Sequence, residues 1–389
     1  MKKYIFILML LGIVACLVQG NWPAAAGLGL VLFIWLAAET RARTRFRFLK
    51  GRGFKEAGFS LGANPAQLEI AWDGSCALFT TLDGAMSMRD AAGRELWKRP
   101  AEPGMLAILP LPGGSCYYAT GDELAFCDAT GRVIRRLSFL PPPFRQSYRI
   151  HLSRDASTLM LHTPWFLQFA DPQLDGLGAR IACEETGHYM KYAGLSPSGD
   201  RVFFAGAKLL EESTEARWGS WKRVEGAWAM DWSQAEEHYS NSHLRSASFS
   251  ADGSALLLEL HREGYEFRVL NLDGSLRLRK AGVEHPVLSP DAAFVAWDSA
   301  AEGLVLASAR DGKKIWFHKS GETIRHKRVD ESGGALALEG RHLRRLGPDG
   351  TMRWEAWFQT DPYRFAASED GRVMALLYQD QGAMLKLPA

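Results

Sequence analysis

The chain has 389 residues, of which 47% are apolar and 23% charged, the composition of an ordinary globular protein. Its formal net charge is +2, but nine of the 46 basic residues precede residue 56. The remainder carries 37 basic against 43 acidic residues, and this mildly acidic balance argues against a nucleic-acid-binding role.

Two apolar runs separated by a short polar break begin the chain. The first covers residues 4–19 and the second covers residues 24–38. Each run is somewhat shorter than the roughly 20 residues that a perpendicular membrane span prefers. Pro23 suits the first turn of a second helix. We therefore expect a two-helix transmembrane hairpin in residues 1–40.

Basic residues flank both apolar runs. Lys2 and Lys3 precede the first run, and a basic juxtamembrane linker, residues 41–53, follows the second. Because Lys and Arg are enriched on the cytoplasmic side of membrane helices, we expect the rest of the chain to lie in the cytoplasm, at the inner (plasma) membrane. The membrane-proximal basic residues are Arg41, Arg43, Arg45, Arg47, Lys50 and Arg52.

Cys16 allows a second interpretation of the N-terminus. The run Ile13-Val14-Ala15-Cys16 follows Met-Lys-Lys and an apolar stretch, and it resembles a bacterial lipobox, whose Cys would be lipidated after cleavage. The apolar Leu17-Val18 that follows is not the usual polar tether. Whether Cys16 is processed stays open at this point. The other cysteines form no CxxC pair, and buried unpaired thiols are their simplest interpretation.

From about residue 66 the sequence repeats with a period near 40 residues. Residues 246–282 show the unit: four short strands, with Asp252-Gly253 and Asp273-Gly274 as two of the turns. Asp-Gly between apolar runs is a strong hairpin signal. A period near 40 with four strands per repeat predicts a β-propeller. The first turn of the unit recurs eight times, at residues 72–74, 112–114, 153–155, 196–199, 250–253, 289–291, 331–333 and 368–371.

The predicted fold class is therefore all-β: an eight-bladed β-propeller in residues 54–389, with seven blades as the alternative, preceded by the two-helix transmembrane hairpin. The eighth repeat shows only three strands. Residues 54–61 are the one unused strand candidate before the first blade. We expect this strand to complete the last blade, which would leave no large unpaired sheet edge.

Three tryptophans follow the second turn of their repeats at the same distance. Trp97, Trp316 and Trp354 each stand four residues after a glycine. This Gly-x-x-x-Trp pattern resembles the quinoprotein-like repeat, and residues 66–389 are similar to the superfamily of quinoprotein-like and WD40-like propellers. The resemblance implies that the three tryptophans dock one blade on the next. It implies an architecture and no particular activity.

The fourth repeat is longer than the others by about a dozen residues and is rich in aromatic side chains. Trp218, Trp221, Tyr239 and His243 are candidates for a surface that binds a partner or ligand, because Trp and Tyr carry much of the energy of interfaces. The alternative is that the aromatic residues here, among them Trp228 and Trp232, are strand residues that pack between blades.

No motif in the sequence identifies an enzyme. A nucleophile elbow, a P-loop and an HExxH helix are all absent. His238 and His243 lie five residues apart, but no third ligand is fixed, so we predict no metal. The adjacent cysteines of alcohol-oxidising quinoproteins are also absent, and we predict no cofactor.

The predicted function is a protein–protein interaction scaffold at the cytoplasmic face of the membrane. Its partners would be the membrane, through the two helices, and an unidentified protein, with no nucleic acid. Two alternatives stay open. One is a small-ligand sensor or enzyme that uses the central funnel, and the other is an envelope-facing assembly factor, similar to propeller lipoproteins of outer-membrane biogenesis.

Overall fold

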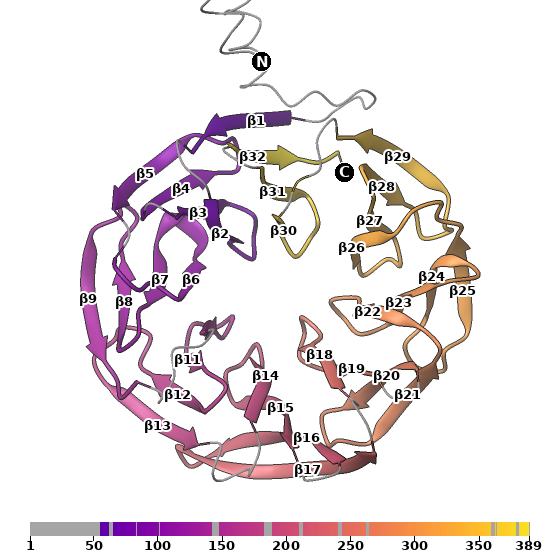
Figure 1. Ribbon diagram of the computed structural model, residues 1–389, viewed down its shortest axis with the longest axis horizontal. Helices are drawn as coiled ribbons and strands as arrows, with labels where there is room; N and C mark the ends of the chain where they lie inside the picture. Colours follow the sequence, from indigo (N-terminus) through magenta and orange to yellow (C-terminus); the bar gives the residue numbers. More distant parts are fainter. Residues whose placement is uncertain are drawn as a thin grey trace, which may run out of the picture.

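The computed structural model describes the chain from residue 55 to residue 388 with several short gaps. The described residues are 55–61, 65–82, 84–100, 102–141, 148–182, 189–209, 213–239, 243–261, 264–358, 362, 364–378 and 381–388. Within these ranges all the regular elements are β-strands, apart from one 3₁₀ turn, η1 (Pro112–Gly114). The strands form eight four-stranded antiparallel sheets arranged as blades around a central channel (Figure 1).

The first four blades take up residues 65–239 in chain order. The first blade consists of β2 (Pro65–Ile70), β3 (Cys76–Thr81), β4 (Ala85–Asp90) and β5 (Glu95–Pro100), and the second of β6 (Ala107–Pro110), β7 (Cys116–Ala119), β8 (Glu123–Cys127) and β9 (Val133–Ser138). The third consists of β10 (Arg149–Leu152), β11 (Leu159–His162), β12 (Phe166–Ala170) and β13 (Leu177–Ala182), and the fourth of β14 (Tyr189–Leu195), β15 (Arg201–Leu209), β16 (Ser213–Val224) and β17 (Ala227–Tyr239).

The last four blades use the remaining strands and one from the start of the described chain. The fifth blade consists of β18 (His243–Phe249), β19 (Ala255–His261), β20 (Tyr265–Asn271) and β21 (Leu276–Ala281), and the sixth of β22 (Glu284–Leu288), β23 (Phe294–Ser299), β24 (Gly303–Ser308) and β25 (Lys314–His318). The seventh consists of β26 (Ile324–Val329), β27 (Ala335–Glu339), β28 (His342–Leu346) and β29 (Met352–Trp357), and the eighth of β30 (Arg364–Ala367), β31 (Val373–Leu377) and β32 (Gln381–Lys386) with β1 (Lys55–Ser60).

The first strand of each blade lies beside the channel and the fourth lies at the rim (Figure 1). Second strands are the most buried, because they pack between neighbouring blades; all six residues of β3 are buried, for example. The Asp-containing turns hold their shape through side-chain bonds. In the turn after β20, the Asp273 carboxylate accepts a hydrogen bond of 2.9 Å from the Ser275 amide. The predicted propeller with eight blades is confirmed.

The ring closes through β1, which forms the fourth strand of the eighth blade. It pairs antiparallel with β32, in a register that runs from Lys55 opposite Lys386 to Ser60 opposite Gln381. This pairing of residues from the two ends of the described chain is the closure that the sequence predicts. The eighth blade thereby gains a rim strand, and β32 is not left as an open sheet edge.

The fold class needs one correction, because the predicted two-helix transmembrane hairpin is not supported. In the part of the chain that the structure describes, no helix is long and apolar enough to cross a membrane. The residues that prompted this prediction, 1–40, and the basic linker, 41–53, lie outside the described residues. The fold class that stands is an all-β eight-bladed propeller.

Neighbouring blades are joined by a contact that recurs around the ring. A side chain on the rim strand of one blade lies against the glycine of the turn between the third and fourth strands of the next. A Cβ built on Gly131 would lie 2.7 Å from the Trp97 ring, and one on Gly350 would lie 2.9 Å from Trp316. The same contact joins Trp232 to Gly274, Leu278 to Gly312 and, at the closure, Ala57 to Gly93.

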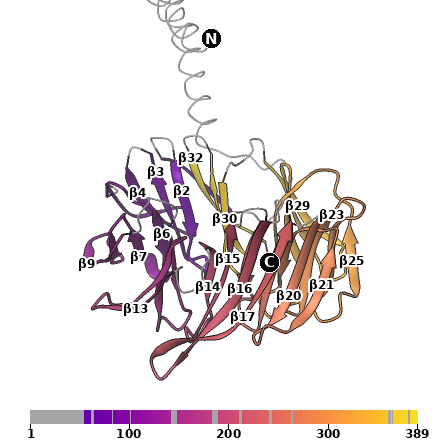
Figure 2. The ribbon, with the colours of Figure 1, turned by 60° about the horizontal axis from the view of Figure 1, so that its bottom comes forward.

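The extra residues of the fourth blade lengthen its two outer strands. β16 has 12 residues and β17 has 13, whereas β15 in the same blade has nine. The β16–β17 hairpin consequently projects beyond the neighbouring blades (Figure 2).

Candidate functional site

The turns between first and second strands gather at one end of the channel. Backbone bonds join several of them from blade to blade: the amide of Asp252 donates to the Pro290 carbonyl at 2.9 Å, and the amide of Glu369 donates to the Trp72 carbonyl at 3.0 Å. The second bond joins the eighth blade to the first, so these two blades are connected at the channel mouth as well as by the β1–β32 pairing at the rim. A fixed ring of turns is a common place for binding residues, because a rigid scaffold positions the loops.

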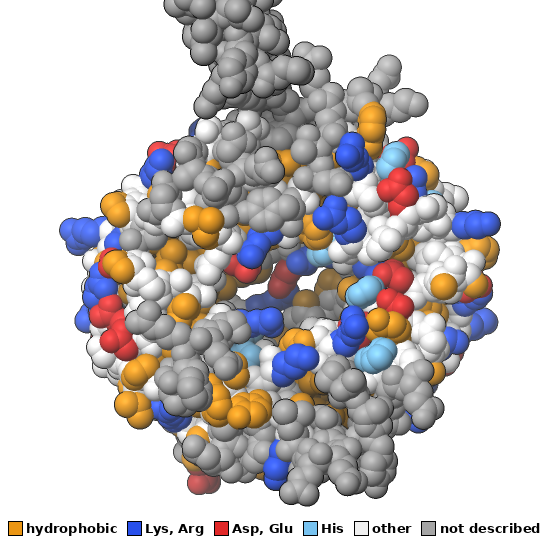
Figure 3. All heavy atoms as spheres, viewed as in Figure 1, with side chains coloured by type: hydrophobic (Ala, Val, Ile, Leu, Met, Phe, Trp, Pro, Cys, Tyr) orange, Lys and Arg blue, Asp and Glu red, His pale blue; other side chains and the backbone are white. Residues whose placement is uncertain are grey.

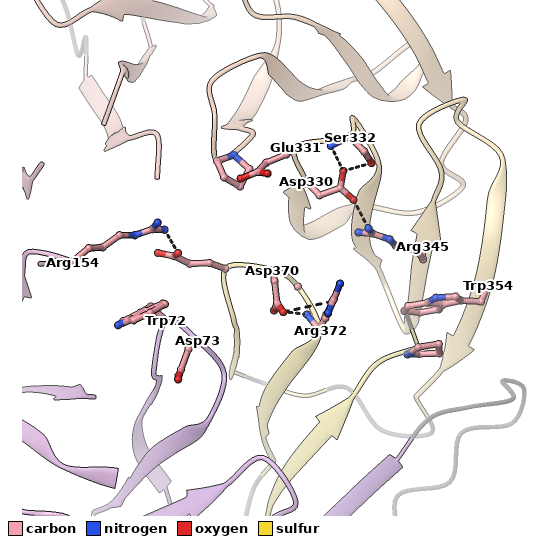
Figure 4. A pocket seen from close by; sticks show the side chains of 14 residues that line it. Trp72, Asp73, Arg154, Asp330, Glu331, Ser332, Arg345, Trp354, Asp370 and Arg372 are labelled. Carbon is pink, nitrogen blue, oxygen red and sulfur yellow. Dashed lines mark hydrogen bonds and ion pairs between the residues drawn. The ribbon is translucent and has the colours of Figure 1, made fainter. Parts of the chain in front are cut away.

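A groove opens among these turns on the side of the first, seventh and eighth blades. Its volume is about 620 Å³, which is within the range of small-molecule and peptide-segment sites. Trp72 stands on its wall with 48% of its surface exposed. Figure 4 shows Arg154 reaching from the third blade toward the groove, where it forms an ion pair with Glu369.

Arg154 also links the ion pair to the aromatic wall, since its guanidinium carbon lies 5.9 Å from the centre of the Trp72 ring. Burial raises the pKa of Glu369, although the charges of Arg154 and Arg328 partly offset this effect. The carboxylate is therefore costly to ionise at this position and depends on its cationic neighbours.

The seventh blade supplies the opposite wall of the groove. Asp330 accepts a hydrogen bond of 2.8 Å from the Ser332 amide and forms an ion pair with Arg345 (Figure 4). Burial alone would raise the pKa of Asp330, but the bond from Ser332 and the charge of Arg345 outweigh it and lower the pKa. Arg372 lies 3.7 Å from Asp370 at the floor of the groove. The three arginines that line the groove, Arg154, Arg345 and Arg372, therefore already have acidic partners.

Trp354 lies at the outer end of the groove, where the repeated contact between blades is altered. In the eighth blade the fourth strand is β1, so no hairpin turn joins it to β32. Trp354, at the position of Trp97 and Trp316, consequently has no turn glycine to face and lines the groove together with Pro388. The irregular closure of the ring thus extends the groove toward the rim.

The structure places two of the predicted binding tryptophans inside the blades. Trp218 and Trp221 lie on β16 with 0% and 8% of their surfaces exposed. Trp218 packs among Phe203, Leu244 and Leu256, toward the fifth blade. Trp221 packs among Phe169 and Phe204, toward the third. Neither side chain is available on the surface of the described chain, and both fill the core.

The other two predicted binding residues lie at the connection between the fourth and fifth blades. Tyr239 is the last residue of β17, opposite Ser213, and His243 is the first residue of β18, opposite His261. The four candidates therefore do not form one cluster. The basic residues Arg41, Arg43, Arg45, Arg47, Lys50 and Arg52, together with Cys16, lie outside the described residues.

The blade-docking tryptophans lie on rim strands, and two of them carry a hydrogen bond to the next blade. Nε1 of Trp97 donates to the Gly114 carbonyl at 2.8 Å, and Nε1 of Trp316 donates to the Gly333 carbonyl at 3.2 Å. Trp232 also donates to the next blade, but to the turn between its third and fourth strands: the bond is 2.7 Å long and ends on the Leu272 carbonyl. Trp232 thus behaves as the alternative interpretation of the fourth repeat anticipates, as a residue packed between blades.

The groove residues were missed by sequence reasoning, although one signal was present. Five of the eight first turns begin with Ser, whereas the first blade has Trp72 just before Asp73-Gly74. A large aromatic residue at a turn position where most of the other blades have Ser indicates a candidate binding surface. Within the described ranges, no group of three His, Cys, Asp or Glu side chains is placed to hold a metal ion.

Comparison with known proteins identifies the fold and no closer relationship. No protein-family model matches the chain, and no curated protein matches it by sequence. Among solved structures, the Dos1 propeller aligns with a TM-score of 0.60 and 10% identity, covering 85% of this chain and 93% of that one. BamB from Moraxella catarrhalis aligns with a TM-score of 0.55 and 11% identity, covering 88% and 100%.

These likenesses define the class of protein as a β-propeller, and the sheets of this chain give it eight blades. They do not single out a function, because the identities are near 10% and 1245 chains of known structure match the fold. What the chain binds must be argued from its own residues.

Proposed function

We propose that this propeller is a protein–protein interaction scaffold and that the groove around Trp72 receives its partner. The observation that carries the proposal is the exposure of Trp72, 48%, beside a groove of about 620 Å³. Exposed Trp next to Arg is the composition of interface hot spots. The rigid ring beneath the turns keeps the groove in one shape, which lowers the entropy lost on binding.

The charges of the groove indicate the chemistry of the partner. Arg154, Arg345 and Arg372 each have an acidic partner within the groove, at Glu369, Asp330 and Asp370. Asp73 and Glu331 also line the groove, and neither has an ion pair within the described residues. The partner segment that fits is therefore a loop with a basic side chain beside an apolar or aromatic one, which would stack on Trp72 or Trp354.

The experiment is a quantitative co-purification of the tagged full-length chain from its own cells. We expect Trp72→Ala and Glu331→Lys each to reduce capture of the same partner, because one removes the aromatic anchor and the other reverses a charge at the rim. Phe317→Ala is the matched control, since Phe317 is an aromatic residue 55% exposed on the rim strand β25, away from the groove. Equal capture by all three variants would refute the groove as the docking site.

The location of the propeller stays a prediction. The expectation of a cytoplasmic position at the inner membrane depends on residues 1–53, which lie outside the described residues.

A further inference from the structure

The central channel contains a charged side chain that has no bonding partner among the described residues. Arg328, on the innermost strand β26, makes no hydrogen bond or ion pair with any described residue, and its Nε atom is fully buried. Burial lowers the pKa of its guanidinium, and the nearby charges of Glu369 and Asp370 offset this only in part. Arg328 as a whole is half-buried, and a buried polar atom without a protein partner is usually satisfied by water, an ion or a ligand.

Arg328 lies at the junction of two cavities within the channel. One has a volume of about 440 Å³ and is lined by residues of the first, second, third, fourth, seventh and eighth blades. The other, of about 370 Å³, lies toward the fifth and sixth blades, and Arg328 lines both. A volume of this size is typical of a small-molecule site.

Two arginines line the larger cavity, Arg154 and Arg328, and Arg154 is already paired with Glu369. Its walls include Ile70, Leu109, Ile150, Leu152 and Phe365. Two histidines also line it, but burial, reinforced by neighbouring cationic and histidine side chains, lowers the pKa of His151 and of His326 to about 3, so both are neutral at pH 7. Arg328 is consequently the positive group around which an anion would settle.

The end of the channel opposite the groove carries several exposed cationic side chains. Five blades carry an exposed Lys or Arg near the start of their innermost strand, and blue side chains border the opening in Figure 3. These exposed residues are Arg149, Lys191, Arg245, Arg325 and Arg364. A ring of one sign at the entrance of a low-dielectric channel raises the local concentration of ligands of the other sign.

We propose that the channel binds a small organic acid, with its carboxylate on Arg328 and its apolar body against Ile150, Leu152 and Phe365. A monoanion fits better than a phosphate dianion, because two carboxylates, Glu69 and Glu369, line the same cavity and their repulsion of an anion grows with its charge. The cavity shares Trp72, Arg154 and Glu369 with the groove. Arg328, Ile150, Leu152 and Phe365 do not line the groove, and binding of an acid to them does not require a protein partner.

The test is isothermal titration calorimetry of the full chain with hexanoate, acetate and inorganic phosphate. We expect hexanoate to bind about tenfold or more tightly than acetate or phosphate, because only hexanoate supplies both the head group and the apolar body. Arg328→Gln should weaken hexanoate binding about tenfold or more, as expected for the loss of a charged hydrogen bond. Arg135→Gln is the matched control and should bind as the wild type does, because Arg135 lies on the rim strand β9 with its side chain 57% exposed.

A second variant separates ligand binding from folding. Ala366, on the innermost strand β30 of the eighth blade, lines the larger cavity. Ala366→Leu should reduce hexanoate affinity because the larger side chain fills part of the cavity while Arg328 stays in place. Hexanoate should also raise the thermal midpoint of the wild type and leave that of Arg328→Gln unchanged. Undetectable hexanoate binding to the wild type, equal binding to Arg328→Gln, or tighter binding of phosphate would each overturn the proposal.

Discussion

Arg154 of the third blade forms an ion pair with Glu369 of the eighth blade, although the two residues are 215 positions apart in the chain. Their side chains are 40% and 36% exposed, so the pair is solvated. Arg154 also lies 5.9 Å from the centre of the Trp72 ring, so the aromatic side chain, the cation and the carboxylate line the same groove. The pair therefore sets the shape of the groove more than it stabilises the fold.

This interpretation predicts a small coupling energy between the two residues. We expect a double-mutant cycle of Arg154→Met and Glu369→Gln, followed by urea unfolding, to give less than about 1 kcal/mol, because solvent screens exposed pairs. The capture of a protein partner should nevertheless fall in both single variants. A coupling energy of several kcal/mol would mean that the pair supports the ring itself.

The contact between rim residues and turn glycines predicts a difference between two glycine substitutions. Gly131 and Gly226 both have positive φ, at 80° and 87°, so Ala is strained at either position. A Cβ on Gly131 would also meet the Trp97 ring at 2.7 Å, whereas nothing lies within 4 Å of one on Gly226.

We therefore expect Gly226→Ala to cost about 1 kcal/mol of unfolding free energy and Gly131→Ala about 2–4 kcal/mol, since only the latter separates two blades. Urea denaturation with a common m-value provides the measurement. Equal losses in the two variants would show that strain alone, without blade docking, determines the effect.

Much of the ring could be predicted from the sequence because its signals are local. The turns such as Asp252-Gly253 and Asp273-Gly274 recur at a regular spacing, and each reports a hairpin directly. The closing strand could be inferred because the eighth repeat lacks one strand and residues 54–61 were unassigned. The tryptophans at Trp97 and Trp316 were found from their fixed distance to a glycine, which reflects the spacing of the contact between blades.

The candidate site could not be predicted in the same way, since it depends on which turns meet across the channel. Trp218 and Trp221 are close together in the sequence and were predicted to lie on a binding surface, but both side chains are buried in the core. Trp72, Arg154 and Glu369 come from three blades that are distant in the chain, and only closure of the ring brings them together. Likewise, nothing in the sequence around Arg328 shows that its guanidinium lacks a partner.

The closing strand β1 makes a specific prediction about Phe59. Its ring packs edge-on against Phe79 of the first blade at 5.0 Å, and the guanidinium of Arg89 lies 4.4 Å from the Phe59 centre. Phe59→Ala should lower the free energy of unfolding by about 2–4 kcal/mol, because it removes an aromatic anchor where the two ends of the described chain meet.

Phe317→Ala, at an exposed position of β25, is the control and should cost less than about 1 kcal/mol. Both variants can be compared by chemical denaturation and by size-exclusion chromatography, since a loosened β1 would expose the β32 edge to intermolecular pairing. A Phe59→Ala variant as stable as the control would imply that β1 contributes little to closure.

The channel residue Glu69 predicts a dependence of stability on pH. The Glu69 side chain reaches solvent in the channel, but desolvation by the surrounding channel walls raises the pKa of its carboxyl group, and the charges of Arg149 and Arg364 offset the shift only in part. The folded state therefore binds this proton more tightly than the unfolded chain does. The favourable contribution of the group is fully present below the unfolded pKa and is lost as the pH rises through the folded pKa, so the ionised carboxylate destabilises the fold at neutral pH.

Gln cannot ionise and occupies nearly the same volume, so Glu69→Gln should have a higher thermal midpoint than the wild type at pH 7. The difference should shrink as the pH falls toward 4, where the carboxyl group of the wild type takes up its proton. Glu331→Gln, an exposed residue at the rim of the groove, serves as the control and should follow the wild type across the range. A lower midpoint for Glu69→Gln at pH 7 would show that attraction to Arg149 and Arg364 outweighs burial, and the balance of charge in the channel would then be the reverse of the one inferred here.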